Sequence, residues 1–102
     1  MAILCISTLP PEVTLENVLA VSAEIAAGGP PTGGISHAVI VNGGQVQIFD
    51  IWESPEALEA FNRDRLTPAV QKLMGGSDPS QLPLPEVQVF EAHDTMAVGA
   101  PQ

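Results

Sequence analysis

The segment Gln45–Gly75 (QVQIFDIWESPEALEAFNRDRLTPAVQKLMG) constrains the fold more than any other part of the chain. Its first part, QVQIFDIW, is a predicted strand with apolar residues on both faces, which indicates burial on both sides. Ser54 and Pro55 then begin a helix, because serine caps free backbone N–H groups and proline has no N–H to leave unpaired. Asp50 and Trp52 share one strand face, which makes that face a candidate site.

Charge and composition limit the classes of partner. The chain has 102 residues, 45% of them apolar, which is enough for one domain with one modest core. We expect this domain to span residues 1–94, with a tail at 95–102. The formal net charge is -9, and the only cations are Arg63, Arg65 and Lys72. Three cations cannot form a basic patch, so we expect neither nucleic acid nor an anionic membrane as a partner.

The N-terminal part and the cysteine content favour a cytoplasmic protein. Cys5 is the only cysteine, which excludes an internal disulfide and is typical of a reducing compartment. Met1–Thr8 is apolar but too short for a signal peptide, and no cation precedes it. No apolar run is long enough to span a bilayer. No cation or helix start near Cys5 would activate its thiol, so we expect it to be buried and inert.

The remaining elements follow from turn and capping signals. We expect strands at Ala2–Thr8, His37–Val41, Gln45–Trp52 and Val87–Ala92. The first helix is capped by Thr14, has an apolar face of Leu15, Val18, Leu19, Ser22 and Ile25, and ends at Gly28. The second runs from near Pro55 to about Met74 and is interrupted at Pro68, with Thr67 able to cap a second segment. Loops are expected at Gly28–Gly34 and Gly76–Pro85, and a tail at Asp94–Gln102.

This order of elements, βαββαβ, predicts an α+β, ferredoxin-like fold with an antiparallel sheet in the order 4-1-3-2. The most apolar strands, the first and the third, take the central positions. Two helices cover only one face of such a sheet, and the other face would remain a large exposed apolar patch. We therefore expect a homodimer formed through the sheet faces.

The sequence IFDIWESPEALEAF, followed by RLTPAVQKLMG, resembles the dimeric α+β barrel superfamily, and especially the antibiotic-biosynthesis-monooxygenase-like proteins. In these proteins the third strand ends in a W-x-S-x-E-A turn into the second helix, which Trp52, Ser54, Glu56 and Ala57 match. The resemblance implies a cofactor-independent monooxygenase that acts on a small hydrophobic or aromatic, polyketide-like molecule. In that chemistry the substrate carbanion supplies electrons to O2, and the protein binds the substrate and removes a proton.

Two departures from this pattern narrow the chemistry. The family often has a histidine early in the second helix, where this chain has Phe61 and Asn62. That histidine is also the haem ligand of the haem-degrading branch, so haem degradation is disfavoured. The chain has no tyrosine, which excludes a mechanism that needs a phenol side chain.

The hairpin at Asn42-Gly43-Gly44 sets a register between the second and third strands. If Asn42 lies opposite Gln45, His37 lies directly opposite Asp50, with Cβ atoms about 5 Å apart. A histidine oriented by a carboxylate is a plausible general base near neutral pH, which makes this pair the candidate catalytic site. The alternative is a structural hydrogen bond at the sheet edge, and a three-residue loop would remove the pair altogether.

Three further residues are candidates for ligand binding. Composition alone favours Trp52 as a core or dimer residue, whereas the resemblance favours a ligand platform. Phe61 would line the same pocket, although core packing is its simpler role. Arg65 could hold an anionic oxygen, although a solvated charge near Asp64 or Glu59 is the more common arrangement.

His37, Asp50 and His93 together suggest a metal site of two histidines and a carboxylate. The predicted strand order argues against it, because His37 and His93 lie on opposite sheet edges, about 14 Å apart, whereas ligands lie about 2.1 Å from a common ion. We therefore expect no metal, with a site across the dimer as the one alternative, and the resemblance implies that no cofactor is needed.

Two functional classes remain open. One is the cofactor-independent monooxygenase, with His37 and Asp50 handling the proton. The other is a non-catalytic dimeric domain that binds a small molecule or is associated with stress, which the scarcity of aromatic residues favours (4%). A cyclase or isomerase on the same fold is a third alternative, because the same pocket could fold a substrate without oxygen.

Overall fold

The computed structural model describes residues 1–75 and 85–95 of the chain. The predicted βαββαβ order is confirmed, with small shifts at the ends of the strands. The elements are β1 (Ile3–Thr8), α1 (Leu15–Ala27), β2 (Gly34–Asn42), β3 (Gln45–Trp52), α2 (Pro55–Phe61), the π-helical segment η1 (Asn62–Leu66), α3 (Thr67–Leu73) and β4 (Glu86–Glu91). The expected loop at 76–85 and the tail at 94–102 fall mostly outside the described residues.

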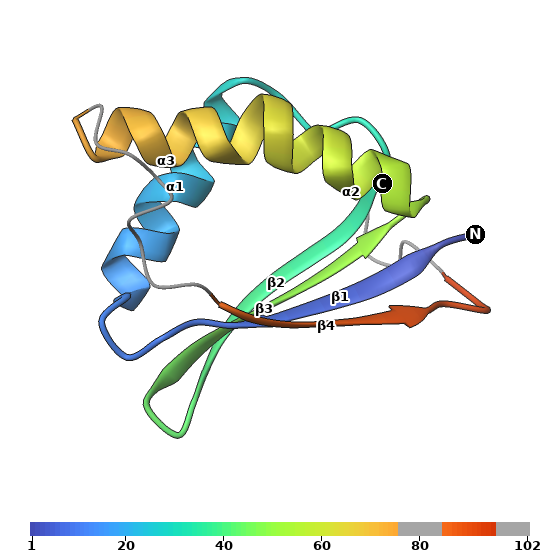
Figure 1. Cartoon of the computed structure of the whole chain (residues 1–102), viewed down its shortest axis with the longest axis horizontal. Helices are drawn as coiled ribbons and strands as arrows, with labels where there is room; N and C mark the ends of the chain where they lie inside the picture. Colours follow the sequence, from blue (N-terminus) through green and yellow to red (C-terminus); the bar gives the residue numbers. More distant parts are fainter. Residues whose placement is uncertain (76–84, 96–102) are drawn as a thin grey trace, which may run out of the picture.

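The four strands form one antiparallel sheet in the order β2-β3-β1-β4, which is the predicted order 4-1-3-2. All helices lie on one side of this sheet (Figure 1). The β2–β3 pairing has Asn42 opposite Gln45 and His37 opposite Asp50, so the predicted register is confirmed. Gly43 and Gly44 have φ of 60° and 83°, the left-handed conformation that this tight turn requires.

The predicted helix starts are confirmed. The Thr14 side chain accepts a hydrogen bond from the Asn17 N–H at 3.1 Å, and the Asn17 side chain accepts from the Thr14 N–H, which completes a capping box. Ser54 accepts from the Ala57 N–H at 3.1 Å, and Pro55 occupies the first helical position. The two caps therefore position α1 and α2 over the sheet.

The second helical region differs from the prediction at its interruption. Thr67 is not a cap, because its backbone is helical (φ -59°, ψ -46°) and its N–H donates to the Asn62 carbonyl five residues back. Pro68 has no N–H to donate, and a proline inside a regular α-helix also clashes with the preceding turn. The π turn at η1 lets the chain continue in a helical path through this position.

The core lies between the helices and one face of the sheet. Ile3 and Cys5 of β1 and Val46 and Trp52 of β3 are buried on this face, and Val18 and Ala69 are buried on the helices. The α1 face is rotated from the prediction, because Leu15 and Leu19 are 39% and 50% exposed. The buried side of α1 is centred on Val18, and α1 packs beside α3 and η1.

The opposite face of the sheet carries apolar side chains that none of the helices in residues 1–75 and 85–95 covers. Alternation along the strands and the observed register place Leu4, Ile6, Ala38, Ile40, Phe49, Ile51 and Phe90 on this face. Ile40 and Phe90 are 41% and 48% exposed. We call these seven residues the open apolar face. Within residues 1–75 and 85–95, the helices are all too short or too polar to cross a membrane.

Candidate functional site

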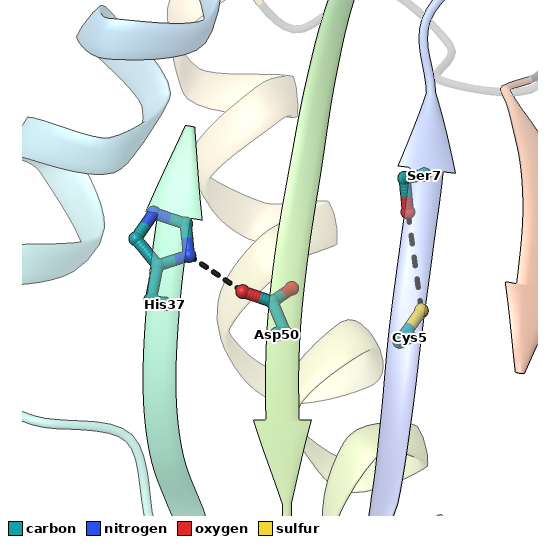
Figure 2. Close-up of polar contacts among 4 residues, drawn as sticks. All are labelled: Cys5, Ser7, His37 and Asp50. Carbon is teal, nitrogen blue, oxygen red and sulfur yellow. Dashed lines mark hydrogen bonds and ion pairs between the residues drawn. The ribbon is translucent and has the colours of Figure 1, made fainter. Parts of the chain in front are cut away.

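The candidate acid–base pair forms as the hairpin register predicts. His37 on β2 and Asp50 on β3 point at each other, with Nδ1 of His37 and Oδ1 of Asp50 2.5 Å apart (Figure 2). Both side chains lie on the helix-facing side of the sheet, because Asp50 alternates in phase with the buried Val46 and Trp52. The hairpin register alone does not decide which sheet face carries the pair, and the structure places it on the face that the helices cover.

The two partners differ in solvent exposure. The side chain of His37 is 53% exposed, whereas that of Asp50 is 17% exposed. Burial raises the pKa of the Asp50 carboxyl above its ordinary value, and the hydrogen bond and charge of His37 lower it only in part. When Nδ1 donates to the carboxylate, Nε2 of the neutral ring keeps a free lone pair. The pair can therefore act as a base through the more exposed histidine, with Asp50 holding the tautomer.

Trp52 follows Asp50 by two residues on the same strand face and is 3% exposed. Its ring stacks against Phe61 of α2, with centroids 4.8 Å apart and planes tilted by 43°. The indole Nε1–H is buried and has no hydrogen-bond partner among the described residues. A buried donor without an acceptor costs free energy, so this N–H is available to an acceptor on a ligand or to a water molecule.

Two shallow hollows lie on the helical side of the molecule; one of them reaches Phe61, and neither is lined by Trp52, His37 or Asp50. One, of about 140 Å³, is lined by Pro31, Thr32, Ala60, Phe61, Asp64 and Arg65. The other, of about 180 Å³, lies between α1 and α3 and also reaches Arg65. Both are smaller than the about 300 Å³ typical of sites for drug-sized ligands. A sizeable ligand could reach Trp52 only after Phe61 or the Gly28–Gly34 loop moves.

Arg65 has a role that sequence reasoning did not anticipate. Its Nη2 donates to the carbonyls of Ile25 and Gly29, at 2.8 and 2.7 Å. These carbonyls lie at the C-terminal end of α1, whose last turn contains no basic residue. Arg65 therefore supplies the cation and the donors that a helix C-terminus requires. Arg63 instead makes an exposed pair with Asp64, which is the solvated arrangement expected for either arginine.

Cys5 lies opposite Asp50 on the next strand and is buried, as expected. Burial raises the pKa of its thiol, the Asp50 charge adds to this, and the contact with Ser7 opposes it (Figure 2). A raised pKa keeps the thiol protonated, so Cys5 is a poor nucleophile. The sheet order also separates His37 on β2 from His93 beyond β4, and the described residues contain no cluster suited to a metal ion.

Comparison with solved structures identifies the fold. A candidate antibiotic biosynthesis monooxygenase from Chloroflexus aurantiacus is 19% identical, with a TM-score of 0.63 over 97% of this chain and 100% of that one. SnoaB, a cofactor-independent oxygenase from Streptomyces nogalater, is 17% identical, with a TM-score of 0.54 over 93% and 94%. MhuD, a haem degrader from Mycobacterium tuberculosis, is 15% identical, with a TM-score of 0.56 over 94% and 99%. No protein-family model and no curated protein matches the chain.

The chain therefore has the α+β fold of the antibiotic-biosynthesis-monooxygenase-type proteins, and the resemblance carried by Trp52, Ser54, Glu56 and Ala57 is confirmed at the level of the fold. An oxygenase and a haem degrader share this architecture at similar identity, so the fold does not choose between chemistries. The choice depends on the site residues of this chain.

Proposed function

We propose that this protein binds a small uncharged aromatic molecule between the sheet and the helices and removes a proton from it, as a cofactor-independent monooxygenase does. The observation that carries the proposal is the His37–Asp50 hydrogen bond on the helix-facing side of the sheet, next to the buried Trp52. His37 would act as the base through Nε2, with Asp50 orienting the ring and stabilising its charge. Trp52 and Phe61 would contact the aromatic rings.

The charge distribution of the protein favours an uncharged ligand. The net charge of -9 repels anions, and the carboxylate nearest to Trp52 on its strand face is Asp50. The three cations are engaged elsewhere: Arg63 with Asp64, Lys72 with Glu24, and Arg65 with the end of α1. The one cation beside the aromatic pair, Arg65, already donates to the Ile25 and Gly29 carbonyls, so a ligand with several carboxylates would lack matching counter-charges there. The unpartnered Trp52 N–H matches a ligand that bears a carbonyl or phenolic oxygen.

The reaction would consume one molecule of O2. Removal of a proton from an activated CH2 group leaves a carbanion, which transfers electrons to O2. One oxygen atom is then retained as a new carbonyl of the product, and the other leaves as water together with the two hydrogens of the CH2 group. The protein would lower the barrier by accepting the first proton, and a positioned base typically contributes about 10²–10⁴-fold to the rate.

A panel of anthrones and phenols tests this proposal through O2 uptake and quinone absorbance. His37→Ala and Asp50→Asn should each lower turnover by about 10²–10⁴-fold. The double variant should be no slower than the worse single variant, because the two residues act as one unit. Full activity of His37→Ala would overturn the mechanism.

The same experiment separates the alternatives. Quenching of Trp52 emission by a panel member without O2 uptake would favour a non-catalytic binding domain, which the small size of the two hollows makes the second candidate. Conversion to an isomeric product without O2 uptake would favour a cyclase or isomerase. Absence of both quenching and turnover across the panel would contradict a binding site at Trp52.

A further inference from the structure

We propose that the loop Gly28–Gly34 is a lid over the Trp52–Phe61 pair and that Arg65 is the latch that holds it closed. This inference goes beyond the proposed function, and it depends on that function only for the identity of what passes under the lid. The proposal explains why Trp52, the residue best suited to contact a ligand, is only 3% exposed, and why the hollow beside its ring partner Phe61 is small.

The loop lies near the edge of the indole. Gly34, which begins β2, pairs with Trp52, and a Cβ on Gly34 would stand 3.5 Å from Cζ3 of Trp52 and 3.9 Å from the Cβ of Pro31 in the loop. Gly33 is packed so closely against α2 that a Cβ would stand 2.6 Å from the Cβ of Ala57. The hollow of about 140 Å³ lies between Pro31 and Thr32 of the loop and Phe61 on the helix. Lifting the loop would therefore enlarge this hollow toward the buried ring.

The loop has a rigid centre between two flexible positions. Pro30 and Pro31 restrict the backbone at its centre. Gly29 and Gly33, with φ of 90° and 82°, stand on either side of them, and glycine can change its dihedral angles at little cost. Rotation at two glycines around a stiff centre moves the loop as a unit and leaves α1 and β2 in place.

The two ends of the loop are held differently. At the sheet end, the N–H of Glu53 donates to the Gly33 carbonyl at 2.9 Å, which extends the strand pairing. At the helix end, Nη2 of Arg65 donates to the carbonyls of Ile25 and Gly29. The bond to Gly29 crosses from η1 to the loop itself. Arg65 also lines both hollows, so its side chain stands where the lid meets the helices.

Trp52 is the only tryptophan, so acrylamide quenching of its emission measures access under the lid without any ligand. Arg65→Gln removes charge-assisted bonds and should raise the quenching rate constant by about threefold or more. Arg63→Gln is the matched control, because Arg63 bonds to the neighbouring Asp64, away from the loop, and is 71% exposed. Lys72→Gln breaks the other cation contact to α1, Lys72–Glu24, away from the loop.

The lid predicts unchanged quenching in both controls and unchanged far-ultraviolet circular dichroism in all three variants. Equal quenching in Arg65→Gln and Arg63→Gln would overturn the latch, and a rise in Lys72→Gln equal to that in Arg65→Gln would show general loosening of α1 instead.

If Arg65→Gln fails to fold, hydrogen exchange of the native chain tests the lid. The amide of Gly34, which donates to the Pro31 carbonyl at 3.2 Å, should then exchange without opening of β1, and exchange only together with β1 would overturn the lid. These readouts stay independent of turnover, so failure of the proposed chemistry leaves them interpretable.

Discussion

At the scale of single residues, Asp50 has the most informative environment. Its raised pKa means that the folded state binds more protons than the unfolded state over the acidic range. The contribution of Asp50 to the free energy of unfolding is therefore fully present below the ordinary carboxyl pKa. It is lost as the pH rises through the raised value. The pair with His37 is consequently kept at a cost to stability near neutral pH, as is common where a site serves chemistry.

Asp50→Asn tests whether the contribution of Asp50 to stability falls as the pH rises. The stability of the native chain minus that of Asp50→Asn should fall as the pH rises from about 3 to about 7, measured by urea unfolding. Asp64→Asn is the control, because Arg63 lowers the pKa of Asp64 and the corresponding difference should change in the opposite direction. If the stability difference for Asp50 rises with pH, the lowering of the Asp50 pKa by His37 outweighs its raising by burial.

Trp52 poses a different question, because its burial fits both a core residue and a ligand platform. Trp52→Phe removes no hydrogen bond, since Nε1 has no partner, and it keeps an aromatic ring against Phe61. Phenylalanine is smaller than tryptophan and leaves part of the buried space empty, so we expect a loss of about 1–3 kcal/mol in the free energy of unfolding. We also expect weaker binding of an anthrone by calorimetry. A loss above about 3 kcal/mol, comparable to deleting a large core side chain, would identify Trp52 as primarily structural.

At the scale of elements, Gly33 is the point where the loop packs most closely against α2. Gly33→Ala should be destabilising for two reasons, the positive φ of 82° and the clash with the Cβ of Ala57 at 2.6 Å. Gly44→Ala is a matched control, because Gly44 has φ of 83° and nothing within 4 Å. The first variant should lose about 1–3 kcal/mol more than the second in urea unfolding.

A double variant isolates the clash. Adding Ala57→Gly to Gly33→Ala removes the atom that the new Cβ would meet. It should recover most of the excess loss, after allowance for the about 1 kcal/mol that glycine costs in a helix. Equal losses for Gly33→Ala and Gly44→Ala would show that the loop shifts freely away from α2, and would weaken the close packing described for the lid.

The elements also show which features could be predicted from sequence. The hairpin Asn42-Gly43-Gly44 is local, and a local turn fixes pairing along two whole strands, so the His37–Asp50 contact followed from it. The contact of Arg65 with Ile25 and Gly29 joins residues 40 and 36 positions apart, and no local pattern encodes it. One signal was present: α1 ends without a basic residue, so its C-terminal carbonyls needed a donor from elsewhere.

The predictions of the apolar face of α1 and of the helix irregularity near Pro68 were wrong for a related reason. Leu15 and Leu19 match a helical apolar period, yet they are exposed, because the position of a helix over a sheet depends on how its neighbours pack. The predicted interruption at Pro68 was wrong in position, because the chain stays helical through Pro68 and the irregular turn lies before it, at Asn62–Leu66. A proline constrains only the local hydrogen bonding. A capped restart at Thr67 and a π turn both satisfy that constraint.

At the scale of the whole molecule, the open apolar face is the feature of the fold that most needs a partner, because it exposes apolar side chains to water. Helices cover one side of the sheet, while Phe49 and Ile6 sit on the other side at the centre of the two middle strands. Water on such a face is unfavourable, and a second copy of the same face is the simplest cover. We therefore expect a homodimer formed through the open apolar face, with a sedimentation mass about twice 10.6 kDa at micromolar concentration.

Phe49→Lys tests this arrangement, because it places a charge at the centre of the open apolar face. The variant should sediment as a monomer, since an unpaired buried charge is strongly unfavourable. Val41→Lys is the control: Val41 is 55% exposed and lies on the helix-facing side of the same sheet, so the mass should stay doubled. Each chain carries a net charge of -9, so added salt should strengthen the association by screening repulsion. A native chain that sediments as a monomer at both low and high salt would contradict the sheet-face dimer and would leave the open apolar face for a different partner.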